Sequence, residues 1–89
     1  MAERVFKVKN KLGLHARPAA LFVQATTRFK SSVKVSKDET EVDGKSIMGL
    51  MMLAAEEGSS VKVVARGDDE AAVLDALQAL FDNYFDEKE

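Results

Sequence analysis

One segment of the chain reads Ser32-Val33-Lys34-Val35-Ser36-Lys37-Asp38-Glu39-Thr40-Glu41-Val42. Apolar and polar residues alternate over 32–36, as they do in a strand with one buried face. The polar run 37–39 predicts a turn, and 40–42 predicts the returning strand of a hairpin. The hairpin indicates an antiparallel sheet, and the segments on either side of it decide what covers that sheet.

The residues before the hairpin predict a strand followed by a helix. Residues 4–9 alternate, with Phe6 and Val8 on one face. Over 16–29 the side chains recur at the spacing of an amphipathic helix. The recurring positions are Ala19, Ala20, Phe22, Val23, Thr26 and Phe29.

The residues after the hairpin predict two helices with a strand between them. Ser46 is a good N-cap for an apolar helix over 47–55, which Gly58 ends. A strand follows at 61–63, and after Gly67 either Asp68 or Asp69 caps a long helix. Its apolar stripe contains Val73, Leu74, Leu77, Leu80, Phe81 and Tyr84. The acidic run 82–89 is expected to be a solvated helix end. The order β-α-β-β-α-β-α fits an α+β fold, an antiparallel sheet with helices on one face.

Composition limits the classes of function. The 89 residues are 46% hydrophobic and suffice for one domain over 1–89. A net charge of -2 argues against general nucleic-acid binding, and the strands carry few aromatic residues for an RNA-binding domain. With no cysteine and one histidine, no metal site is expected. No membrane span or signal peptide is evident, so we expect a cytoplasmic protein.

The single histidine lies in the run Gly13-Leu14-His15-Ala16-Arg17-Pro18-Ala19. Proline suits the first turn of a helix, which places His15 at the helix N-terminus beside Arg17. Backbone N–H groups, the helix dipole and a guanidinium would all favour an anion there. A neutral imidazole is also a good nucleophile, so the run predicts a histidine that carries or meets a phosphate. The alternative is an ordinary capping histidine, but Gly13 and the small alanines also fit an uncrowded site.

Two motifs then identify a family. Leu14-His15-Ala16-Arg17-Pro18-Ala19-Ala20 resembles the phosphorylation-site signature of the histidine-containing phosphocarrier (HPr) family of the bacterial phosphoenolpyruvate:sugar phosphotransferase system. Gly44-Lys45-Ser46-Ile47-Met48-Gly49-Leu50-Met51 resembles the regulatory-serine region of the same family. The resemblance covers essentially the whole chain. It implies an open-faced β-sandwich, with four antiparallel strands ordered 1-4-2-3 and three helices on one face.

The resemblance also implies roles for the two residues of the first motif. His15 would accept phosphate from phospho-enzyme I on the ring nitrogen that faces the helix, and would pass it to an enzyme IIA-type domain. Arg17 would stabilise the phosphoryl group, since its planar donors match phosphate oxygens. This describes a carrier without cofactor rather than an enzyme with a substrate pocket of its own.

The second motif implies a regulatory site and a docking surface. Ser46 is an N-cap first, and by resemblance it is also a target of an HPr kinase/phosphorylase, whose phosphate would add charge to a binding face. The helix behind it is apolar nearly all round, so it cannot bury every side. Leu50 and Leu53 suit the core. The remaining positions, with two alanines of the first helix, form the expected docking patch of Ala16, Ala20, Ile47, Met48 and Met51.

Two alternatives stay open. Some relatives act only as regulators that bind partners through the serine face, although the presence of His15 disfavours this reading. The pathway is also open, since the Ser46 motif favours the sugar branch whereas residues 79–86 look more like carriers of the nitrogen-related branch. A monomer suits a shuttle that presents one face to several partners.

Overall fold

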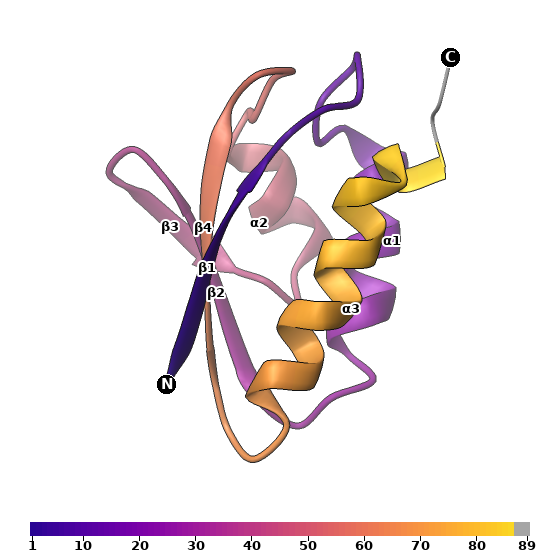
Figure 1. Cartoon of the computed structure of the whole chain (residues 1–89). Helices are drawn as coiled ribbons and strands as arrows, with labels where there is room; N and C mark the ends of the chain where they lie inside the picture. Colours follow the sequence, from indigo (N-terminus) through magenta and orange to yellow (C-terminus); the bar gives the residue numbers. More distant parts are fainter. Residues whose placement is uncertain (87–89) are drawn as a thin grey trace.

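The four strands form one antiparallel sheet in the order β1-β4-β2-β3. Figure 1 shows the computed structural model, which describes residues 1–86. The strand bounds are β1 Ala2–Lys7, β2 Ser32–Lys37, β3 Thr40–Asp43 and β4 Ser60–Arg66. Strand β1 lies at one edge of the sheet, and β4 lies between β1 and β2. The expected α+β class, element order and strand order are therefore confirmed.

Three helices lie on one face of this sheet (Figure 1). They are α1 Ala16–Thr26, α2 Ile47–Met52 and α3 Glu70–Asp82, and a short 3-10 turn, η1 Tyr84–Asp86, follows α3. Helix α3 packs against β1, β4 and α1, while α1 also contacts α2. Within residues 1–86 no helix covers the other face of the sheet, as in the expected open-faced sandwich.

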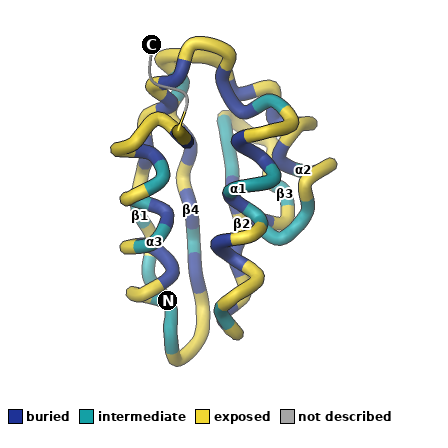
Figure 2. The backbone as a smooth tube through the Cα atoms, turned by 90° about the vertical axis from the view of Figure 1, so that its right-hand side faces the viewer, coloured by how far each residue is buried: buried dark blue, intermediate teal, exposed yellow. Residues whose placement is uncertain are grey.

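The core lies between the sheet and the helices. Burial alternates along β2 and β4, so one face of each of these two strands is apolar and covered (Figure 2). Four phenylalanines meet in its centre: the Phe81 ring stacks on Phe6 at a centroid distance of 4.6 Å and meets Phe85 edge-on at 4.8 Å. Phe22 meets Phe81 edge-on at 6.3 Å. Aromatic packing from β1, α1 and α3 thus fixes the helices against the sheet.

Several predicted boundaries were wrong by a few residues. The first strand spans Ala2–Lys7 rather than 4–9, α1 ends at Thr26 rather than at 29, and α2 ends at Met52 rather than at 55. Helix α2 stops because Ala54 has a left-handed backbone with φ 51°. The last helix ends at Asp82, so Tyr84 is outside it. The expected solvated helix end at 82–89 extends beyond the described residues.

Asp69 stands at the N-cap position of α3, but its side chain does not cap the helix. Its carboxylate instead accepts the backbone N–H groups of Lys30, at 2.9 Å, and Ser31, at 3.0 Å. The Ser31 hydroxyl donates to it as well. The aspartate therefore joins the end of the α1 segment to the start of α3, which corrects the expected capping role.

Candidate functional site

His15 is the N-cap residue of α1. Its backbone is extended, with φ −80° and ψ −168°, and its carbonyl accepts the N–H of Ala19 at 3.0 Å, which closes the first helical turn. The imidazole makes no capping hydrogen bond to that turn. His15 is half-buried, so the ring is accessible while its backbone is held by the helix.

The loop before His15 is held by hydrogen bonds, one of which reaches a residue far away in the sequence. The Leu14 N–H donates to the carbonyl of Ala55 at 2.9 Å, and the buried Asn10 side chain donates through Nδ2 to the carbonyl of Gly13 at 2.6 Å. Gly13 has φ +70°, and a Cβ there would lie 2.2 Å from the Ala55 carbonyl oxygen. Only glycine fits this close approach, which sets the direction from which the chain enters α1.

The first turn of α1 offers donors beside the imidazole. The N–H groups of the first turn have no acceptor within the helix, and Pro18, buried at the third helical position, has no N–H to satisfy. The exposed Arg17 guanidinium makes no hydrogen bond or ion pair within residues 1–86. The turn and the guanidinium can therefore bind an anion. An anion at this helix end is stabilised by about 0.3–1 kcal/mol.

His15 also lines a surface hollow of about 320 Å³. We call it the His15 hollow, and its lining residues are Leu12, Leu14, His15, Met51, Ala54, Ala55 and Glu56. It brings His15 together with Met51 of the docking patch. Sequence reasoning missed Leu12, whose side chain is 73% exposed although apolar. The one signal for it is a leucine in a polar loop close before the histidine.

The outer side of α2 is apolar and exposed. Met48 is 72% exposed, while Ile47 and Met51 are 41% and 43% exposed. Leu50 and Leu53 are buried, as predicted from the rule that one helix cannot cover every side. On α1, Ala16 is exposed and Ala20 half-buried. All five residues of the docking patch thus have accessible surface, on two helices that are in contact.

Ser46 is the N-cap of α2, as predicted. Its hydroxyl oxygen accepts the N–H of Gly49 at 3.0 Å. The segment before it is tied to the C-terminal end of α1, because Thr26 Oγ1 donates to the Gly44 carbonyl at 2.8 Å and Lys45 Nζ donates to the Phe29 carbonyl at 2.9 Å. The serine is therefore fixed relative to the helix that carries His15 at its other end.

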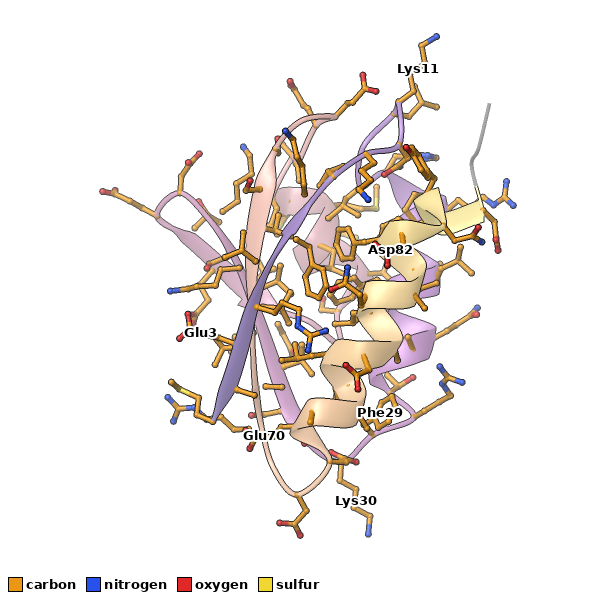
Figure 3. All side chains as sticks on the ribbon, in the orientation of Figure 1. Glu3, Lys11, Phe29, Lys30, Glu70 and Asp82 are labelled. Atoms are coloured by element: carbon orange, nitrogen blue, oxygen red, sulfur yellow. The ribbon has the colours of Figure 1, made fainter. Side chains whose placement is uncertain are left out.

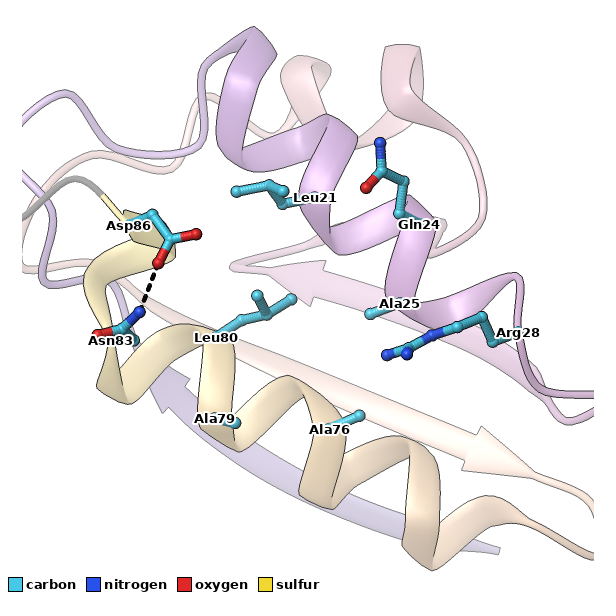
Figure 4. A pocket seen from close by; sticks show the side chains of 9 residues that line it. All are labelled: Leu21, Gln24, Ala25, Arg28, Ala76, Ala79, Leu80, Asn83 and Asp86. Atoms are coloured by element: carbon cyan, nitrogen blue, oxygen red, sulfur yellow. Dashed lines mark hydrogen bonds between the residues drawn. The ribbon is translucent and has the colours of Figure 1, made fainter.

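A larger groove of about 530 Å³ separates α1 from α3 (Figure 4). Its floor is apolar, with Leu21 and Leu80 facing one another across it, and its polar residues are Gln24, Arg28, Asn83 and Asp86. Asn83 Nδ2 donates to Asp86 Oδ1 at 2.5 Å at one end. No predicted site residue lines this groove.

Within residues 1–86 no group of three or more His, Cys, Asp or Glu residues is arranged to hold a metal ion. Within the same residues no helix has the length and apolar character needed to cross a bilayer.

Comparison with known proteins supplies the family. The family model described as the phosphorylation site of the phosphotransferase-system HPr component matches residues 2–83. The phosphocarrier protein HPr of Treponema pallidum is 47% identical over 99% of this chain and 100% of its own length. The crystal structure of HPr from Thermoanaerobacter tengcongensis superposes with a TM-score of 0.95 at 48% identity, and each chain is covered fully.

A third relative is Crh, the catabolite-repression protein of Bacillus subtilis, described as an intertwined dimer formed by swapping. It superposes with a TM-score of 0.75 at 46% identity, over 94% of this chain and 97% of its own. The match of the family model and the identity over the full length agree with the fold and with the histidine at the start of α1. The chain therefore belongs to the HPr family of phosphocarrier proteins of the phosphotransferase system.

Proposed function

We propose that His15 receives a phosphoryl group from phospho-enzyme I and passes it to an enzyme IIA-type domain. The observation that carries this proposal is the accessible imidazole at the N-terminus of α1, beside Arg17, whose guanidinium bonds to no residue of 1–86. A ring nitrogen, the one that faces the helix, attacks phosphorus. The new N–P bond forms as the donor's bond to phosphorus breaks, and no water or cofactor takes part.

Arg17 and the first turn of α1 would hold the transferred group. The guanidinium offers paired donors to phosphate oxygens, and the turn offers backbone N–H groups. Both groups are at the surface, where a contact between opposite charges contributes little free energy. Modest stabilisation suits a carrier, because the phosphoryl group must leave again for the acceptor.

The docking patch would recognise donor and acceptor alike. Ala16 and Ala20 leave room for a partner, while Ile47, Met48 and Met51 supply an apolar surface that adapts to different shapes. Both partners need access to the same His15. A single surface used in turn therefore accounts for successive binding.

Ser46 would serve as a regulatory site for an HPr kinase/phosphorylase. Because its hydroxyl already caps α2, a phosphate there would meet favourable N–H groups and the helix dipole. The modification would then act by adding negative charge beside the docking patch rather than by unfolding the helix. An acid-stable phosphate formed with ATP and absent from Ser46→Ala would test this.

We further propose that the whole chain acts as one phosphocarrier domain, as a cytoplasmic monomer. A monomer leaves the docking patch open to either partner. The swapped dimer described for Crh is the competing arrangement, and light scattering across a range of protein concentrations distinguishes the two. A concentration-independent mass of one chain supports the monomer.

A purely regulatory role is the second candidate, and the likeness to Crh favours it. The presence of both His15 and Arg17 favours the carrier. The pathway would be decided by offering the phosphorylated protein acceptors from the sugar branch and from the nitrogen-related branch.

The principal experiment incubates the protein with phosphoenolpyruvate and enzyme I. We expect one acid-labile, base-stable phosphate on the native protein and none on His15→Ala. Circular dichroism checks that the variant is folded. Label that persists on His15→Ala would refute the assignment of His15, and a folded native protein that takes no label would refute the carrier function.

A further inference from the structure

We propose that Met51 is an oxidation site through which a hydroperoxide slows phosphoryl exchange at His15. The inference rests on the proposed function and concerns its regulation. Met51 is the methionine that lines the His15 hollow, and 43% of its surface is exposed. Its thioether is thus open to a small oxidant and shares a cavity with the imidazole.

The chemistry needs only a hydroperoxide such as hydrogen peroxide. With hydrogen peroxide, the thioether sulfur attacks one peroxide oxygen and the O–O bond breaks. The proton of the attacked oxygen passes to the leaving oxygen, so that an S=O bond forms and water leaves. Sulfur is oxidised by two electrons and the peroxide is reduced. The product is a methionine sulfoxide, which sulfoxide reductases can return to methionine.

Oxidation of Met51 would change the polarity of the His15 hollow. Leu12 and Leu14 add apolar side chains to the lining of the hollow, and Glu56 adds a negative charge. A sulfoxide oxygen adds a strong, partly negative acceptor to this space. It would oppose the burial of a partner's apolar side chain and repel a phosphoryl group on its way to His15.

Met52 is the control that separates the effect of a sulfoxide near His15 from the effect of a sulfoxide at any exposed position. It follows Met51 on the same helix and is 74% exposed, so it is the more accessible thioether. Successive residues of a helix are rotated by about 100°, and Met52 does not line the His15 hollow. Peroxide should therefore oxidise Met52 at least as fast as Met51, with little effect on exchange.

The experiment treats three proteins with hydrogen peroxide: the native protein, Met51→Leu and Met52→Leu. Leucine matches methionine in volume and cannot be oxidised by this route. Peptide mass spectrometry gives the extent of sulfoxide formation at each position. The rate of phosphorylation by phospho-enzyme I is then expressed relative to the same protein before treatment, so that any basal effect of a substitution cancels.

We expect the native protein and Met52→Leu to lose rate by roughly fivefold to tenfold, the size of effect of a central interface residue. Met51→Leu should lose markedly less of its own rate, and the loss that remains is that of Met48, which lies in the docking patch and is oxidised in all three proteins. Treatment with sulfoxide reductase should restore the phosphorylation rate of the native protein. An equal loss in Met51→Leu, or no loss in the native protein with Met51 fully oxidised, would overturn the inference.

A second measurement does not depend on phosphoryl transfer. The imidazole resonances of His15 should shift when Met51 is oxidised in Met52→Leu, and should stay in place when Met52 is oxidised in Met51→Leu. If the untreated native protein takes no label, the proposed function fails and the regulatory inference fails with it. If the protein takes label but the His15 imidazole resonances do not shift when Met51 is oxidised, the inference alone fails.

Discussion

Ser31 donates both its backbone N–H and its hydroxyl to the carboxylate of Asp69, across the junction between the α1 segment and α3. Lys30 adds a further backbone N–H. The Ser31 hydroxyl bond and then the Lys30 N–H bond hold the pKa of the Asp69 carboxyl below its ordinary value of about 3.8. The charged carboxylate is therefore the form that joins the two segments.

Because the pKa of Asp69 is lowered in the folded protein, its stabilising contribution is complete above the unfolded value of about 3.8. It is lost as pH falls through the lowered pKa of the folded state. Asp69→Asn should lower the melting temperature at pH 7 and make it less sensitive to acid below pH 4, measured by thermal unfolding across pH. Asp68→Asn, at the exposed neighbouring position, is the control and should behave like the native protein.

Gly13→Ala should destabilise the fold and impair His15 together. The left-handed backbone costs a residue with a Cβ about 1–2 kcal/mol, and displacement of the Ala55 carbonyl adds to this cost. We expect a loss of more than about 2 kcal/mol in the free energy of urea unfolding, with slower phosphorylation.

Gly58→Ala is the matched control for that substitution. Gly58 has φ +89°, yet a Cβ there would meet nothing within 4 Å. It should lose about 1–2 kcal/mol from backbone strain alone and keep the native phosphorylation rate. Equal losses of stability and of rate in the two variants would show that the contact with Ala55 does not position His15.

Ser46 allows the cap and the regulatory role to be separated. Ser46→Ala removes the acceptor for the Gly49 N–H and should cost about 1 kcal/mol of unfolding free energy. Ser46→Asp keeps an acceptor and should stay within about 0.5 kcal/mol of the native protein, because aspartate and serine cap equally well. Its added charge should nevertheless slow transfer from phospho-enzyme I. An aspartate variant with the native transfer rate would argue against electrostatic inhibition at this position.

Arg17→Ala should affect transfer without affecting the fold. Arg17 is exposed and bonded to no residue within 1–86, so its removal should change the unfolding free energy by less than about 0.5 kcal/mol. Loss of the surface contact between the guanidinium and the phosphoryl group, worth up to about 1 kcal/mol, should slow phosphorylation by about twofold to fivefold. Arg28→Ala, an exposed arginine just beyond the end of the same helix, should leave the rate unchanged. Similar rates for both variants would remove the proposed role of Arg17.

Local periodicity was sufficient to predict the strands and helices, since the alternation at 32–36 and the stripe from Val73 to Phe81 each describe one buried face. It was not sufficient at the ends of the elements. Tyr84, Phe85 and Asp86 all have positive φ, and this turn swings Phe85 back onto Phe81 although the apolar pattern alone would continue the helix.

The site was predictable only in part for a related reason. The run from Gly13 to Ala19 carries its own signal for a helix start, so His15 and Arg17 could be found from the sequence. Leu12 joins Met51 in the His15 hollow through the bond between the Leu14 N–H and the Ala55 carbonyl. That contact spans residues far apart in the chain, and no local pattern reports it.

The junction that Asp69 makes lies far from the loop that leads to His15. Figure 3 places Lys30, beside the junction, and Lys11, in the loop before His15, at opposite ends of the molecule. Substitutions at the Lys30 end can raise or lower the melting temperature while the opposite end stays as it is. Lineages living at different growth temperatures can therefore adjust the durability of this fold at the junction without altering the residues around His15.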